Sequence, residues 1–109
     1  MWFIFPQLAG LGHSPTAQFY GIASVNEALA YIQNPVLGSR LRQSVEALLA
    51  SAGKRTAEQI LGGIDALKLK SSLTLFDTVE RGGLFERALL NLFGGDRDQL
   101  TLALLHREQ

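Results

Sequence analysis

Apolar residues recur along this chain at intervals of three and four positions, the spacing of one face of an α-helix. One such stripe lies between positions 25 and 32 and consists of Val25, Ala28, Leu29 and Ile32. Ser24 lies just before this stripe and Glu27 lies in its first turn, which is the pattern of a capping box. In a capping box the serine hydroxyl accepts from an amide of the first turn, and the glutamate side chain reaches back to the amide of the serine. Asn34-Pro35 ends this helix, because the residue before a proline avoids the helical conformation.

A second stripe follows at once. Asn34 is predicted to cap this helix, with Pro35 at its first position, where a missing N–H costs nothing. Gly53 is expected to end it as a left-handed cap residue. The side chains expected to point inward are Leu37, Leu41, Val45, Leu48, Leu49 and Ala52.

The second half of the chain predicts four more helices. Thr56 with Gln59 begins a short one that Gly62-Gly63 closes, and Asp65 is expected to cap the next, over about 65–81. Apolar residues cover more than one stripe of that helix, which predicts that it runs through the middle of the core. The last two are expected over about 84–93 and 98–106. Their inward residues are expected to be Phe85, Ala88, Leu89, Leu92 and Phe93, then Leu100, Leu104 and Leu105.

Near the start, Ser14-Pro15 predicts a helix through Phe19 and Tyr20. No stretch alternates as a strand would, and leucine is far commoner than β-branched residues. With 109 residues the chain is long enough for one domain. We therefore expect an all-α fold over residues 1–109, a compact single-domain bundle of about five to seven short helices.

Charge and cysteine content narrow the classes of function. Ten basic and ten acidic residues give zero net charge, so we expect neither nucleic acid nor a membrane as a partner. Low repulsion between copies favours self-association. The absence of cysteine excludes disulfides and thiolate chemistry and makes the cytoplasm the expected location. The apolar opening is no signal peptide, because it lacks a basic start and Pro6 interrupts it.

Several short blocks occur in order along the whole chain. They are Met1-Trp2-Phe3-Ile4-Phe5-Pro6-Gln7, Gly10-Leu11-Gly12-x-Ser14, Ala17-x-Phe19-Tyr20-x-Ile22, Pro35-Val36-Leu37-Gly38-x-Arg40-Leu41, Lys68-Leu69-x-Ser71-Ser72-x-Thr74-Leu75-Phe76, Gly94-Gly95 and Thr101-Leu102. In these blocks the chain resembles the bacterial domain of unknown function 1810 family, which sometimes carries a calpastatin-like label. The resemblance implies an all-α fold and no established activity.

The chain departs from the pattern of that family in two places. Members usually have Lys-x-x-His just before the Met-Trp pair, preceded by further helical chain. Either the start of this sequence was assigned too late, or, as we expect, this domain is shortened at its N-terminus relative to the family. Asn34 stands where the family tends to have histidine. Asparagine keeps the capping role there.

The loop Gly10-Leu11-Gly12-His13-Ser14 enters a predicted helix and is the first candidate ligand site. Exposed amides at a helix N-terminus, with glycines that allow close approach, can hold a phosphate or a carboxylate. The alternative is a tight turn with a serine cap. No flanking strand supports a nucleotide-binding fold.

Lys68, Ser71 and Ser72 are the second candidate. Lys68 and Ser72 are i, i+4 neighbours on a helix, so a cation and a hydroxyl could meet an anion together. The alternative is a solvated lysine with serines packed against a neighbouring helix. A Ser-Lys hydrolase pairing lacks an identifiable oxyanion site.

Other polar residues give weaker signals. His13 and His106 have no metal-ligand spacing, so we expect no metal and no cofactor. Asp77 and Arg81 are predicted to pair as i, i+4 neighbours, and Glu80 is expected to be solvated surface, as are Glu86 and Arg87.

Trp2, Phe3 and Phe5 are expected to lie in the core. If the preceding helices of the family are absent, these rings instead form a surface for a protein partner. The favoured hypothesis is a non-catalytic helical module that binds a partner or self-associates. The alternative is a binder or enzyme for a small phosphorylated or nucleotide-like ligand, held by the Gly10–Ser14 loop with Lys68 and Ser72. A calpain-inhibitor role does not fit, because such segments are disordered and this chain is too apolar for disorder.

Overall fold

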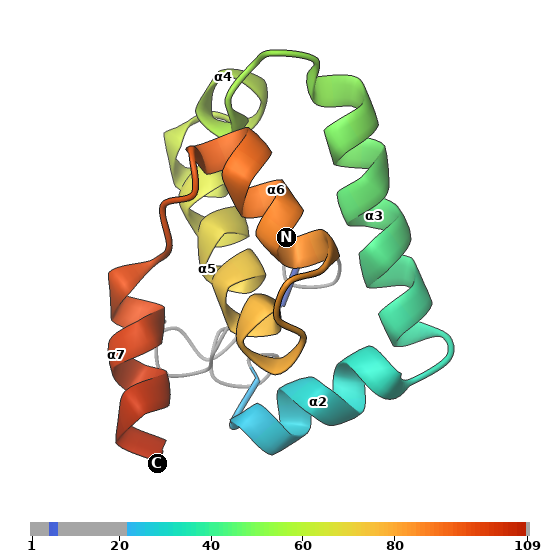
Figure 1. Ribbon diagram of the computed structural model, residues 1–109, viewed down its shortest axis with the longest axis vertical. Coiled ribbons are helices and arrows are strands. Elements are labelled where there is room, and N and C mark those ends of the chain that lie inside the picture. Colours follow the sequence, from blue (N-terminus) through green and yellow to red (C-terminus); the bar gives the residue numbers. More distant parts are fainter. Residues whose placement is uncertain (1–4, 7–21, 109) are drawn as a thin grey trace.

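The computed structural model describes residues 5–6 and 22–108, and this part of the chain forms six helices without a strand. The helices are α2 (Val25–Gln33), α3 (Leu37–Ala52), α4 (Ala57–Leu61), α5 (Gly63–Val79), α6 (Leu84–Phe93) and α7 (Gln99–Glu108) (Figure 1). The all-α prediction is confirmed. The predicted helix after Ser14-Pro15 lies outside the described residues.

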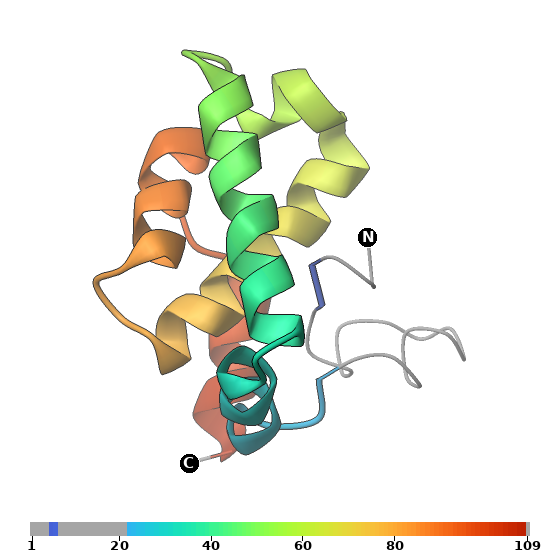
Figure 2. The same ribbon diagram turned by 90° about the vertical axis from the view of Figure 1, so that its right-hand side faces the viewer.

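Helix α5 is the central element of the bundle. It packs against α2, α4, α6 and α7, while α3 packs against α2 and α6. Figure 1 shows α3 and α7 on opposite sides of α5, and in Figure 2 α3 runs the length of the bundle while α2 turns away from its lower end. This confirms the central position that the apolar coverage of the helix predicted.

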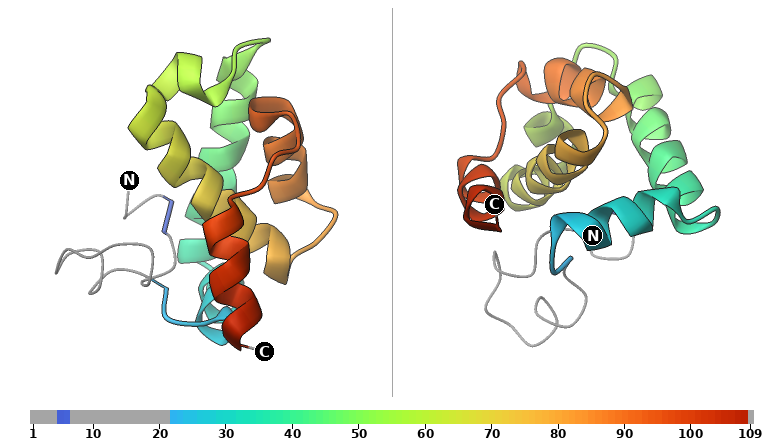
Figure 3. Two further views of the ribbon diagram at one scale, coloured as in Figure 1. Left: turned by 90° about the vertical axis from the view of Figure 1, so that its left-hand side faces the viewer. Right: turned by 60° about the horizontal axis from the view of Figure 1, so that its bottom comes forward.

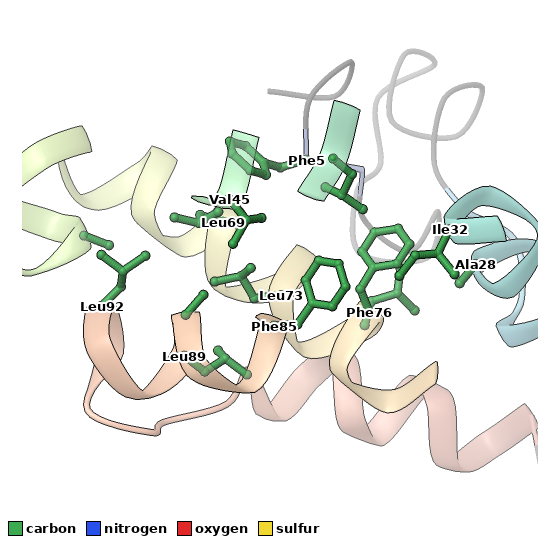
Figure 4. Close-up of a cluster of buried hydrophobic side chains, with 14 of the residues drawn as sticks. Phe5, Ala28, Ile32, Val45, Leu69, Leu73, Phe76, Phe85, Leu89 and Leu92 are labelled. Atoms are coloured by element: carbon green, nitrogen blue, oxygen red, sulfur yellow. The ribbon is translucent and has the colours of Figure 1, made fainter. Parts of the chain in front are cut away.

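Phe76 and Phe85 are fully buried in the core, and the partly buried ring of Tyr31 packs against it. The centroid of the Phe76 ring lies 5.6 Å from that of Tyr31 and 5.6 Å from that of Phe85. Around them gather leucines and small residues from α3, α5 and α6 (Figure 4). Aromatic pairs at such tilted geometries add about 0.5–1.5 kcal/mol each beyond the area they bury.

The predicted caps explain where several helices begin. The Ser24 Oγ accepts from the Glu27 amide at 3.1 Å, although Glu27 reaches back to the amide of Ala23 rather than to that of Ser24. Thr56 and Gln59 form the full reciprocal capping box. These local pairings predicted the starts of α2 and α4 correctly, because each satisfies amides that the first turn leaves without partners.

Asn34 also has its predicted role, one turn before α3. Its Oδ1 accepts from the amides of Val36 and Leu37 at 2.9 Å each, and the Gly38 amide donates to the Asn34 carbonyl. The turn before Leu37 is therefore already bonded as a helix.

Four predictions about helix faces and ends are wrong. Leu29, expected in the apolar stripe of α2, is 38% exposed. Asp65 does not cap α5, because Gly62, at a φ of 85°, turns the chain directly from α4 into a helix that begins two residues earlier. Leu37 is exposed at the start of α3. Leu100 is exposed because Thr101 and Leu105 are the residues of α7 that turn inward.

Glu80 is not simply solvated surface, as the sequence predicted. The Arg42 Nη1 donates to its Oε1 at 2.7 Å, Nη2 donates to Oε2, and the guanidinium lies 6.0 Å from the centroid of the Phe85 ring. This two-point contact ties α3 to the end of α5.

The same contact predicts a dependence of stability on pH. Hydrogen bonds from Arg42 lower the pKa of Glu80 below its ordinary value of 4.5. A lowered folded-state pKa stabilises the fold above the unfolded-state value, and this contribution is lost as pH falls through the folded pKa. We expect Glu80→Gln to lose less stability than wild type when urea unfolding is followed from neutral pH to about pH 3. An equal acid-side loss in the two proteins would contradict this.

No helix within the described residues is long and apolar enough to cross a membrane.

Candidate functional site

The predicted ligand residues of α5 do not form an open site. Ser71 and Ser72 are both buried, while Lys68 is half-buried. The Ser71 Oγ donates to the Leu67 carbonyl at 3.1 Å, and the Ser72 Oγ has no hydrogen-bond partner in the part of the chain that the structure describes. Neither hydroxyl faces solvent, so a dissolved anion does not meet Lys68 and Ser72 together in this conformation.

The other predicted site residues are mostly beyond the described ranges. Gly10, Gly12, His13 and Ser14 lie outside them, so the predicted meeting of that loop with Lys68 stays a prediction. Trp2 and Phe3 lie outside them as well.

Phe5 alone of the proposed aromatic partner surface is described. It is 8% exposed and belongs to the core, close to Val45 and Leu69 in Figure 4. Its ring is therefore not available to a partner in this structure. Phe5 lies in the core, as expected.

One face of α5 carries a polar ladder. Lys70, Thr74 and Asp77 are spaced i, i+4 and i+7, so they lie on one face of the helix. The Arg97 Nη2 donates to Asp77 Oδ2 at 2.6 Å and Nε donates to the same oxygen at 3.2 Å. The partner of Asp77 is thus Arg97, and the predicted pairing with Arg81 is wrong.

The rest of this ladder fixes the start of α7. The Thr74 Oγ1 accepts from the Asp98 amide at 3.0 Å. The Asp98 Oδ2 accepts from the amide of Thr101 at 2.9 Å and from its hydroxyl at 2.6 Å, so Asp98 caps the helix. These contacts position α7 against α5.

Lys70 completes the ladder. Its Nζ donates to Asp96 Oδ2 at 2.7 Å and lies 5.7 Å from the centroid of the Phe93 ring. The hydrogen bond and the charge of Lys70 lower the pKa of Asp96. Together, the ladder residues form ion pairs and a helix cap. The Thr101 hydroxyl, which donates to the Asp98 carboxylate, is fully buried, so it does not face a dissolved substrate.

Beside this ladder, α4, α5 and α6 enclose an open groove of about 280 Å³. We call it the α5 groove. Its lining is Thr56, Glu58, Gly63, Ala66, Leu67, Lys70, Leu92 and Phe93. Figure 3 (left) shows α4 and the first turns of α5 together at one end of the bundle.

Two large apolar side chains next to the α5 groove are exposed to solvent. Ile64 is 76% exposed and Leu67 is 58% exposed. We call these two residues together with the groove the α5 surface. The sequence pattern did not predict it, because apolar residues cover more than one stripe of this helix, which favours a helix buried on all sides. The signal was present in Ile64 and Leu67, which fall outside the stripe of Leu69, Leu73 and Phe76.

A second cavity of about 350 Å³ lies between α3 and α6. Its lining is Glu46, Leu49, Ala50, Ala52, Gly53, Arg87 and Asn91. None of the strongly exposed apolar side chains in the described part of the chain lines it. Each cavity has two charged residues in its lining, so this one differs from the α5 groove in lacking a strongly exposed apolar side chain at its wall.

Metal binding has no support within the described residues, where no group of three histidines or carboxylates comes together.

The family model described as "Protein of unknown function (DUF1810)" matches residues 1–105. The conserved hypothetical protein Rv1873 from Mycobacterium tuberculosis is 44% identical in sequence to this chain, and its crystal structure matches with a TM-score of 0.90. The match covers 96% of this chain and 75% of that one. No curated protein matches.

Proposed function

The chain belongs to the DUF1810 family of unknown function, and we propose from its exposed apolar side chains that this domain is a non-catalytic helical module that associates with a protein partner through the α5 surface. Its membership confirms the resemblance found in the sequence. The proposal keeps the favoured function of the sequence analysis and places the partner surface on α5.

The exposure of Ile64, 76% of its surface, is the observation that carries the proposal. A branched aliphatic side chain gains about 25 cal/mol for each Å² of apolar surface removed from water. Leu67 projects one turn further along the same helix and lines the α5 groove. Adjoining exposed apolar residues of this kind mark association sites more often than single ones do.

The polar groups of the described residues support a non-catalytic role. Ser71 and Ser72 are buried, and the polar side chains that meet one another form ion pairs and caps. A catalytic site requires a nucleophile or a base that reaches a substrate. The α5 surface offers mainly aliphatic and aromatic groups instead.

A photo-crosslinking comparison tests this function. We expect p-benzoylphenylalanine in place of Leu67 to form a covalent adduct with a protein when the native host is irradiated, because this position would lie in the interface. The matched control has the same residue in place of Leu100, which is 57% exposed on α7. Adducts at neither position, or only at position 100, would contradict the proposal.

The alternative function, binding of a small phosphorylated or nucleotide-like ligand by the Gly10–Ser14 loop with Lys68 and Ser72, stays a prediction. It requires the unfolding temperature to rise when nucleotides or sugar phosphates are added. Association through α5 requires no such rise.

A further inference from the structure

We propose that the partner of the α5 surface is a second copy of this chain, related to the first by a two-fold axis that passes close to Leu67. This inference rests on the proposed function, because it uses the same surface. It adds the identity of the partner and the pairing of side chains across the interface.

The order of side chains around α5 is the first argument. Successive residues of a helix are about 100° apart, so Ala66 and Lys70 lie on the side of the groove and Leu67 lies at its edge. Ile64 follows beyond Leu67, and Lys68 lies beyond Ile64. The aliphatic projection and the groove are therefore on opposite sides of Leu67.

This arrangement is self-complementary. A two-fold axis that lies in the interface and runs parallel to α5 brings each side of this helix against the opposite side of its copy. An axis near Leu67 thus brings Ile64 of one copy over the groove of the other, and the reverse. An apolar cavity of about 150 Å³ holds a benzene molecule, so the groove of about 280 Å³ has room for an isoleucine side chain. There it would meet the partly exposed ring of Phe93.

Charge is the second, independent argument. Lys68 lies on the outer side of Ile64, and Glu58 lines the groove from α4. Neither makes an ion pair within the described residues. The same two-fold axis brings Lys68 of each copy towards Glu58 of the other, so opposite charges meet twice.

The remaining charges do not oppose this pairing. Lys70, at the groove wall, is already neutralised by Asp96. The whole chain has ten basic and ten acidic residues, so two copies do not repel each other at long range. A second copy therefore matches both the shape and the charge of the surface.

Sedimentation equilibrium on four proteins tests the pairing: wild type, Lys68→Glu, Glu58→Lys and the double variant. We expect wild type to dimerise in a concentration-dependent manner. Each single reversal sets two pairs of like charges against each other and is expected to raise the dimer Kd about tenfold. The double variant restores opposite charges and should return the Kd to within about threefold of wild type.

Two further variants separate this interface from others. Ile64→Ala should weaken the dimer, because it removes the side chain that fills the groove. Arg87→Glu, a charge reversal on α6 at the other cavity, should leave the Kd unchanged. All substituted side chains are at least partly exposed, and circular dichroism checks that each variant folds.

The results distinguish this inference from the proposed function. A wild-type monomer at all concentrations overturns the dimer, as does a double variant weaker than both single variants. If the protein is monomeric and position 67 crosslinks to a different protein, the two-fold dimer is wrong and the proposed function holds. If position 67 forms no adduct, both fail.

Discussion

Replacement of Gly38 by alanine lowers the free energy of unfolding by about 3 kcal/mol, at the upper end of the usual cost of an overpacked contact. A Cβ at this position would lie 2.1 Å from the Ile32 carbonyl oxygen and 2.8 Å from its carbon. Both are backbone atoms, so no side-chain rotation relieves the clash and α2 must move away from α3. Alanine's better helix propensity offsets only about 1 kcal/mol.

Urea unfolding followed by circular dichroism measures this loss, and the chain supplies a matched control. A Cβ added at Gly63 meets nothing within 4 Å, so Gly63→Ala should stabilise the protein by about 0.4–1 kcal/mol through the entropy of the unfolded chain. If Gly38→Ala is as stable as wild type, the close packing of α2 on α3 is wrong.

Replacement of Arg97 by alanine is expected to cost about 2 kcal/mol, because it leaves the buried Asp77 carboxylate without its partner. Asp77 Oδ1 already has no hydrogen bond within the described residues. The expected cost is below that of a fully buried pair, since the Arg97 side chain is 36% exposed and water reaches it. The same urea unfolding measures it.

Two companion variants show whether the pairing causes the loss. Arg81→Ala removes the exposed arginine one turn after Asp77 and should change stability by less than about 0.5 kcal/mol. Adding Asp77→Asn to Arg97→Ala removes the unpaired charge and should recover part of the loss. A larger loss from Arg81→Ala than from Arg97→Ala would contradict the assignment of the ion pair.

Local chemistry explains why so much of the fold could be predicted. Ser24, Asn34 and Thr56 each accept from amides within three residues, so their role depends only on nearby chain. The partner of Asp77 depends on the packing of α7 instead. Arg97 is twenty residues away, and no spacing rule distinguishes it from Arg81 at i+4. The prediction that Leu100 points inward was wrong for a similar reason. Asp98 caps α7 and is hydrogen-bonded to Thr74 of α5, and these contacts set the orientation of α7.

The candidate site was harder to predict than the fold. Two consecutive serines are unfavourable in a helix, so Ser71 and Ser72 were predicted to bind a ligand. Both are buried instead, because α5 is the central helix. The exposure of Ile64 and Leu67 was not predicted, because apolar residues occur on several sides of α5. Which side of a buried helix reaches solvent depends on how far its neighbours extend, and no pattern within the helix itself gives that.

The claim that the α5 surface is where this protein meets its partner is tested most directly by extending photo-crosslinking to every strongly exposed apolar position. In the described residues these positions are Leu29, Val36, Leu37, Ile64, Leu67, Leu90 and Leu100. Each is replaced in turn by p-benzoylphenylalanine, and the adduct yield is measured in the native host. We expect high yields at positions 64 and 67 and background yields at the other five. Equal yields throughout, or the highest yield at one of those five, would contradict the account.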